Sequence, residues 1–221
     1  MNHSSGRAGR PEGSSRAILE EAAAELFLEQ GYTGSTIAQI SRRAGVSRNT
    51  FFHYFSVKSD LLWVAVDRVL AGLPAAFADA DPALPPTDAV HCALLRVADG
   101  FGSADVPWAL THSDVMGTSA ELQASAVARI TAQAAVVARF VQARDARTAA
   151  LAEPFAWAVL AAGATAAAIW ARSGVQRAPL ARYVDAAVAP VCAGFAQHWS
   201  ELPVTASHPH PPVSGSRDPV R

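Results

Sequence analysis

The sequence predicts an all-α protein, and three observations support this prediction. Alanine accounts for 49 of the 221 residues, and alanine has the highest helix propensity, whereas β-branched and aromatic residues dominate strands. Apolar residues recur at helical spacing between the two polar ends of the chain. Hydrophobic residues make up 51% of the chain and charged residues only 17%, so it can bury a sizeable core. A β-sandwich or β-barrel is therefore excluded.

The first helix is expected over residues 16–30. Its apolar side chains recur on one face at helical spacing. They are Ile18, Leu19, Ala22, Ala23, Leu26 and Phe27. Gly31 then supplies a C-terminal stop, because glycine readily adopts the left-handed conformation that ends many helices.

Two short helices joined by a tight turn follow. Ser35 or Thr36 can cap the first, which ends near Ala44, and Gly45 offers the positive φ that a tight turn needs. Ser47 can cap the second, which reaches about Tyr54. A helix, a turn containing glycine and a second helix form the helix-turn-helix pattern.

Longer helices are expected over the rest of the chain. One begins at Lys58 and ends near the break at Gly72-Leu73-Pro74, and residues 79–86 form a loop. The later helices are expected at about 87–102, 107–116, 119–145, 153–172 and 179–200.

No segment is expected to cross a membrane or to direct export. Residues 154–171 carry no charge and reach the length of a candidate span. They are mostly alanine, however, and Glu153 and Arg172 bracket them, so we expect a helix buried between other helices. Residues 1–13 lack the apolar stretch of a signal peptide, and we expect a cytoplasmic protein.

A local positive surface lies on a chain whose net charge is −1. Residues 33–59 contain no Asp or Glu, yet they hold Arg42, Arg43, Arg48 and Lys58. The second helix of a helix-turn-helix presents its N-terminal residues to base edges in the major groove. The sequence therefore predicts a DNA-binding surface here, although a solvated surface is the alternative for the charges alone.

The residue types at the start of this second helix suit base recognition. Arg48 can pair with guanine, Asn49 with adenine, and the methyl group of Thr50 can touch a thymine methyl. His53 and Tyr54, one turn later, can reach a base edge or a phosphate. Lys58, near the start of the next helix, suits a phosphate.

The chain from about residue 14 to residue 64 closely resembles the DNA-binding segment of the TetR/AcrR family of regulators. The resemblance rests on the run Ser35-Thr36-Ile37 … Ile40-Ser41-Arg42-Arg43-Ala44-Gly45-Val46-Ser47-Arg48-Asn49-Thr50-Phe51-Phe52-His53-Tyr54-Phe55 … Lys58-Ser59-Asp60-Leu61-Leu62. It implies a dimeric, all-α repressor whose C-terminal domain binds a small molecule and thereby changes the separation of two DNA-reading heads.

The same resemblance assigns roles to individual residues. In the family's pattern Thr36, Tyr54 and Lys58 match positions that touch the DNA backbone, whereas the base-facing positions match Arg48, Asn49, Thr50 and His53. Arg43 completes the candidate DNA-binding set. Ala38 and Phe52 depart from the pattern, because many members carry a polar or basic residue and a tyrosine there.

Four regions are expected. Residues 1–13 form a flexible arm, residues 14–60 the helix-turn-helix domain, residues 61–201 a ligand-binding and dimerisation domain, and residues 202–221 a flexible tail rich in Pro and His. Within the third region, aromatic, Met and His side chains suit an apolar ligand site, with packing in the core as the alternative. These candidates are Phe101, Trp108, His112, Met116 and Trp157.

The last two helices are expected to form a dimer interface. Their small and apolar side chains form smooth stripes that a four-helix bundle of two copies would bury, with a monomer core as the alternative. The candidate interface residues are Ala158, Ala162, Ala166, Val184, Val188, Val191 and Phe195, and Pro190 is expected to kink the last helix.

Neither a metal nor a cofactor is expected. A zinc site would need a ligand spacing that His198, His208, His210 and Cys192 do not have. We expect no reactive thiol either, because no basic residue flanks Cys92 or Cys192 closely enough to lower the thiol pKa.

The sequence as a whole predicts a repressor that a small, largely apolar effector releases from a palindromic DNA operator. An architectural or non-specific DNA-binding protein is one alternative, but a net charge of −1 disfavours coating of DNA. A small-molecule enzyme on a helical fold is the other alternative. It has less support, because no catalytic triad, phosphate-binding loop or carboxylate pair stands out in the sequence.

Overall fold

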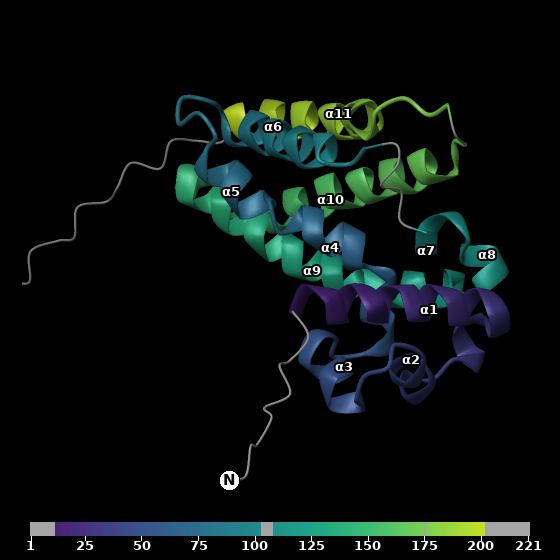
Figure 1. The fold of residues 1–221 in the computed structure, drawn as a ribbon. Helices are drawn as coiled ribbons and strands as arrows, with labels where there is room; N and C mark the ends of the chain where they lie inside the picture. Colours follow the sequence, from purple (N-terminus) through teal and green to yellow (C-terminus); the bar gives the residue numbers. More distant parts are fainter. Residues whose placement is uncertain (1–11, 103–107, 175, 202–221) are drawn as a thin grey trace, which may run out of the picture.

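The computed structural model describes residues 12–102, 108–174 and 176–201, and these residues form helices and no strand. A small group of N-terminal helices lies at one end of the molecule, and a larger helical bundle lies above it (Figure 1). The prediction of an all-α protein is confirmed. The expected N-terminal arm and the Pro/His-rich tail, including His208 and His210, fall almost wholly outside the described residues.

The small group consists of α1 (Glu12–Gly34), α2 (Ile37–Arg43) and α3 (Arg48–Tyr54). The first helix breaks where its stop was expected, at Gly31 with φ +76°. Gly45 has φ +66° in the turn between α2 and α3, so the tight turn uses the left-handed conformation that its glycine permits.

Side-chain caps fix both helices of the helix-turn-helix. The Thr36 hydroxyl accepts the backbone N–H of Gln39 at 3.2 Å, and the Gln39 side chain accepts the backbone N–H of Thr36 at 2.8 Å. The hydroxyl of Ser47 accepts the backbone N–H of Thr50 at 3.0 Å. Each cap satisfies an N–H group that has no partner within its own helix, so both helices begin where the sequence predicts.

A connecting segment differs from the single long helix expected after Lys58. The structure has a 3-10 helix, η1 (Lys58–Leu62), and then α4 (Val64–Leu70) and α5 (Leu73–Ala78). The interruption lies at Trp63, whose φ of −111° and ψ of 0° depart from helical geometry. Its indole N–H donates to the Ser125 hydroxyl at 2.8 Å, which ties this corner to a later helix.

The larger bundle contains the remaining helices. They are α6 (Pro86–Asp99), α7 (Trp108–Thr111), α8 (Ser113–Met116), α9 (Ser119–Arg144), η2 (Ala146–Thr148), α10 (Ala149–Arg172) and α11 (Leu180–Ser200). The helix expected at 107–116 is therefore two short helices. The helix expected from residue 153 begins four residues earlier and continues through Pro154. Figure 1 shows α10 between α9 and α11, with α6 beside α11.

The small N-terminal group and the larger bundle each have a hydrophobic core of their own. The N-terminal core centres on Phe27, Ile40 and Phe51, all fully buried. The C-terminal core centres on Phe155, Trp170 and Val188. Burial of large apolar side chains is the main force that stabilises each.

Two helices, α9 and the segment Ala146–Arg172 that includes α10, are long and apolar enough to span a membrane. In the structure α10 packs against α9 and α11 and buries Phe155, Val159 and Trp170. This arrangement is that of a core helix, as the sequence predicts for residues 154–171.

Candidate nucleic-acid interface and ligand cavity

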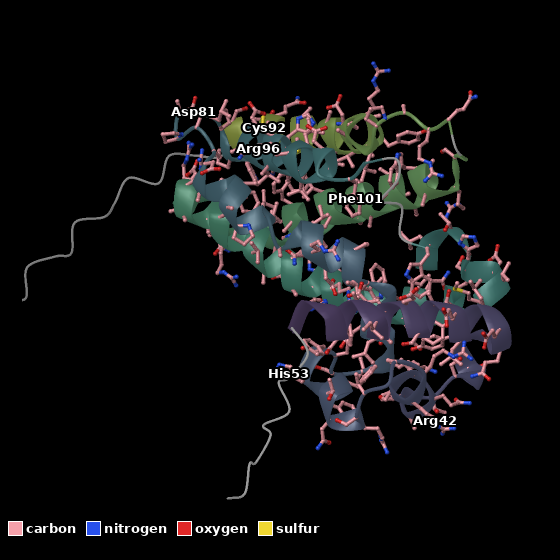
Figure 2. The ribbon with its side chains drawn as sticks, viewed as in Figure 1. Arg42, His53, Asp81, Cys92, Arg96 and Phe101 are labelled. Atoms are coloured by element: carbon pink, nitrogen blue, oxygen red, sulfur yellow. The ribbon has the colours of Figure 1, made fainter. Side chains whose placement is uncertain are left out.

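Helix α3, the second helix of the helix-turn-helix and therefore the candidate recognition helix, presents polar side chains to solvent. Phe51 is fully buried and Phe55 is 3% exposed, so the apolar side of α3 is fixed in the N-terminal core. Arg48 and Asn49 in the first turn are exposed, and neither side chain is tied to another described residue. His53 is also exposed and lies at one side of the small helical group in Figure 2. Helix α3 can therefore enter a major groove without disrupting the packing of the N-terminal core.

Other candidate DNA contacts already have a role within the protein. The Thr50 hydroxyl lies 2.9 Å from the Ser47 hydroxyl, within the cap of α3. Thr36 is exposed and caps α2. Tyr54 is half-buried, and its ring lies edge-on to the ring of His53 at 4.9 Å.

Lys58 is tied to the protein backbone more closely than the sequence predicts. Its ammonium donates to the carbonyl oxygens of Tyr32 at 2.7 Å and Ser35 at 2.8 Å. Burial lowers the pKa of Lys58, because removal from water disfavours the charged form. An ammonium has three N–H donors; the two carbonyl oxygens take two of them, and the Tyr32 ring centre lies 3.9 Å from the same nitrogen.

Arg42 and Arg43 are adjacent in sequence but differ in their ion pairs. Arg43 forms ion pairs with Glu29 at 2.6 Å and Glu25 at 3.4 Å on α1. The hydrogen bond from Arg43 holds the pKa of Glu29 below its usual value. Arg42 is exposed, as Figure 2 shows, and has no ion pair among the described residues. The guanidinium of Arg43 must leave two carboxylates before it can meet a phosphate, whereas that of Arg42 need not.

A cavity of about 520 Å³ lies within the larger bundle. Ligand sites for small molecules usually measure about 300–1,000 Å³. Apolar side chains from α4, α6, α9, α10 and α11 form most of its wall, among them Val66, Leu94, Ile130, Val159 and Val184. Polar and charged groups, including Arg129, Gln133 and Asp114, are few. The cavity therefore suits a largely apolar molecule.

The structure separates the five candidate ligand residues. Phe101 lines the cavity, and its ring lies 6.2 Å from that of Trp170 (Figure 2). Met116 lies elsewhere: it is 1% exposed in the N-terminal core, so it is not a lining residue. Trp108 also packs there, 6.0 Å from the ring of Phe27.

The last two candidates lie outside the lining for different reasons. His112 is exposed, and its Nδ1 lies 2.8 Å from the Thr111 hydroxyl. Trp157 packs partly buried against the C-terminal core, on a part of α10 that does not line the cavity. Helical spacing alone could not distinguish these positions, because α7 contacts α10 in the bundle whereas α8 packs against α1.

The structure also divides the candidate dimer residues. Ala166 is 3%, Val184 6% and Val188 0% exposed, because they pack inside the protomer. A side chain buried in this way cannot contact a second copy, which corrects their assignment. Ala158, Ala162, Val191 and Phe195 are partly exposed. The outward surface of α10 instead carries Ala161, Thr165 and Ile169, the last 48% exposed.

Comparison with known proteins agrees with this arrangement. Residues 19–63 match the family model of the tetR family of bacterial regulatory proteins. Residues 84–196, half of the chain, match the model of the MftR C-terminal domain. The chain belongs to the TetR family. It is thus a TetR-family transcriptional regulator, with a helix-turn-helix domain for DNA and a C-terminal helical domain.

Relatives of known name are similar over different lengths of this TetR-family chain. The mycofactocin biosynthesis regulator MftR of Mycobacterium tuberculosis is 29% identical, over 78% of this chain and 87% of its own. The HTH-type regulator HbdR of Aromatoleum sp. is 47% identical over 55 residues, which are 25% of this chain and 24% of its own. The shorter and stronger match shows that the similarity to HbdR is confined to a small part of the chain.

A solved structure shares the fold of this TetR-family chain. FadR of Thermus thermophilus, a repressor crystallised with lauroyl-CoA, aligns with a TM-score of 0.52 at 18% identity. The alignment covers 88% of this chain and 99% of FadR. At this identity the likeness concerns the fold alone.

Sequence reasoning missed the roles of four residues at the junction between the two parts. Arg129 on α9 lines the cavity and forms ion pairs with Asp60 at 3.1 Å and Asp67 at 3.0 Å. Trp63 lines the same cavity, with the Arg129 guanidinium 5.1 Å from its ring centre. No local pattern signals these contacts, because the partners lie more than sixty residues apart.

Proposed function

We propose that this TetR-family chain acts in the cytoplasm as a homodimeric repressor, released from a palindromic operator by a small, largely apolar effector. The cavity in the C-terminal domain is the observation that carries the proposal. It lies against α4 and α9, which directly contact the N-terminal helices, so a ligand there can act on the DNA-binding domain. Effector binding would then favour the conformation whose affinity for the operator is lower.

The exposed start of α3 supports the proposed reading of DNA sequence. Arg48 and Asn49 have the chemistry for guanine and adenine, respectively, and both are free to reach a base. His53 extends the same surface by one turn, while Thr36, Thr50, Tyr54 and Lys58 are proposed to position the helix on the DNA backbone. Arg43 is proposed as a weaker contact, because Glu25 and Glu29 compete for its guanidinium.

The proposed dimer uses the outward surfaces of α10 and α11. Small side chains at Ala158, Ala161 and Ala162 allow a second helix to approach closely, and Ile169 offers apolar area. A two-fold axis would then place two copies of α3 on the same side of the dimer. Half-sites one helical turn of DNA apart, or a multiple of it, follow from this symmetry.

One experiment separates the proposed repressor from a non-specific DNA-binding protein. The purified chain would select fragments from sheared genomic DNA of its source at physiological salt, and the retained fragments would be sequenced. We expect enrichment of a short palindrome. Retention without a shared sequence would contradict operator recognition and favour the architectural alternative.

The same selection tests a relation to MftR. Since the C-terminal domain matches the MftR model, enriched palindromes beside genes for mycofactocin biosynthesis would extend the similarity from sequence to regulated genes. Palindromes beside unrelated genes would limit the similarity to the fold and the family.

A further inference from the structure

Arg129 connects the cavity to two elements of the chain at once. Arg129 lines the cavity, and 18% of its side chain is exposed. Nε donates to Asp67 on α4 at 3.0 Å, and Nη2 donates to Asp60 on η1 at 3.1 Å. The Asp60 side chain is 26% exposed and that of Asp67 43%, so the pair with Asp60 is the better shielded from water and the stronger of the two.

Asp60 extends this connection to the end of the recognition helix. While its Oδ1 accepts from Arg129, its Oδ2 accepts the backbone N–H groups of Ser56 at 2.9 Å and Val57 at 3.1 Å. These two residues directly follow Phe55, the C-cap of α3. One carboxylate therefore ties the recognition helix to α9.

Trp63 makes a second link at the same wall. Its ring lies under the Arg129 guanidinium, and its indole N–H donates to the Ser125 hydroxyl on α9. Trp63 and Arg129 both line the cavity, so a molecule bound there can contact both residues.

We propose that Arg129 transmits occupancy of the cavity to the recognition helix: a ligand packed against Trp63 and Arg129 breaks the Arg129–Asp60 ion pair and releases the end of α3 from α9. This inference rests on the proposed effector role of the cavity. Arg129 acts here through Asp60 and is a positioning residue, with no contact to DNA.

The charges at this wall also define the ligand. One guanidinium faces the two carboxylates of Asp60 and Asp67, so the cluster carries an excess negative charge. An anionic group placed there would be repelled by this excess charge, and a cation would lose its hydration in a cavity whose wall is mostly apolar. The end of the effector that meets this wall is therefore uncharged, and its body is apolar like the remaining wall.

The first test needs neither ligand nor DNA. Hydrogen exchange of peptides covering residues 55–62 would be followed by mass spectrometry in the full-length protein. We expect Arg129→Gln to speed exchange in this segment about tenfold, the size of a typical coupling between sites. Arg139→Gln is the matched control, because Arg139 is exposed on the same helix, has no ion pair among the described residues and carries the same charge. Asp67→Asn should change the rate of hydrogen exchange in residues 55–62 less than Asp60→Asn does.

A double variant separates the effect of the Arg129–Asp60 ion pair from the effect of the hydrogen bonds that Asp60 accepts from Ser56 and Val57. Asp60→Asn weakens the cap of Ser56 and Val57 whatever Arg129 does. If Arg129 acts through Asp60, adding Arg129→Gln to Asp60→Asn changes exchange little further. Additive effects of the two substitutions would overturn the proposal. Should Arg129→Gln fail to fold, Arg129→Lys replaces it in the same cycle, since lysine keeps the charge but not the paired geometry.

The second test uses 1-decanol as an uncharged probe and decanoate as its anionic counterpart. Calorimetry should show tighter binding of decanol, and decanol should speed exchange of residues 55–62 in the unsubstituted protein. In Arg129→Gln, decanol should still bind but no longer change exchange, a result that a merely structural role for Arg129 would not give.

The remaining outcomes separate the two proposals. If decanol binds and leaves exchange of residues 55–62 unchanged, the Arg129 inference fails while the cavity remains a ligand site. If Arg129→Gln exchanges like Arg139→Gln, the inference fails whatever the probes do. If neither probe binds, the effector role of the cavity is contradicted, and the ligand part of the inference fails with it. Tighter binding of decanoate than of decanol would overturn the uncharged ligand class.

Discussion

The ammonium of Lys58 lies 3.9 Å from the centre of the Tyr32 ring and donates to the Tyr32 carbonyl oxygen at 2.7 Å. Lys58 begins η1, three residues after Phe55, the C-cap of the recognition helix, and Tyr32 follows the break at Gly31 in α1. The lysine thus joins two segments of the N-terminal domain. The Ser35 carbonyl oxygen, one residue before the cap of α2, accepts from the same ammonium.

Lys58→Met should therefore lower both stability and DNA affinity. Loss of the ammonium removes one donor from the Ser35 carbonyl oxygen and one from that of Tyr32, which still accepts the Ser35 backbone N–H at 3.2 Å. We expect the free energy of unfolding to fall by about 1–2 kcal/mol. If the third N–H meets a phosphate, the slope of log affinity against log salt should also fall by about 1. Urea unfolding and a salt series of DNA binding measure the two effects. An unchanged salt slope would assign Lys58 to structure alone.

The local features of this N-terminal domain could be predicted because they are encoded within a few residues. Thr36 and Ser47 are caps by residue type, and Gly45 permits the positive φ of the turn. The role of Lys58 could not be predicted in the same way. Its partners are backbone carbonyls more than twenty residues away, and any residue type would provide them.

Arg48→Ala should change DNA specificity more than Arg43→Ala. Arg48 is exposed and unpaired among the described residues, so its removal should cost about 1–3 kcal/mol at one base position of the selected operator and little on unrelated DNA. Arg43 is held by Glu29 and Glu25, and its removal should slightly lower the affinity for DNA of every sequence. Competition binding with operators changed one base pair at a time measures this. Equal effects of both substitutions on DNA specificity would contradict the proposed contact between Arg48 and a base.

The cavity and the dimer surface were harder to predict for one physical reason. Alanine-rich helices are apolar on every side, so periodicity cannot tell an inward from an outward surface. Val188 and Ala161 illustrate the problem, because the first is fully buried inside the protomer and the second is exposed. Contacts between distant segments, such as Arg129 with Asp60, arise only once the helices are packed.

Alkylation should distinguish the two cysteines. Burial raises the pKa of the Cys192 thiol to about 12, with a further contribution from Asp88, so almost no thiolate forms at pH 8. Cys92 is exposed on α6, as Figure 2 shows. Iodoacetamide at pH 8 should therefore label Cys92 within minutes and label Cys192 only after unfolding in urea, as peptide mass spectrometry can measure. Rapid labelling of Cys192 in the native protein would mean that the contact between α6 and α11 opens readily.

Ala161→Glu should convert the proposed dimer to monomers. Ala161 is exposed on α10, and in the proposed interface a glutamate there would be buried opposite its own symmetry mate without a compensating cation. Sedimentation velocity should show a species of half the mass, with helical content unchanged. Ala135→Glu is the matched control, because Ala135 is exposed on α9, away from α11. Val188→Glu would not serve, since Val188 is fully buried and the charge would unfold the protomer. A dimer that persists in Ala161→Glu would place the interface outside this surface of α10.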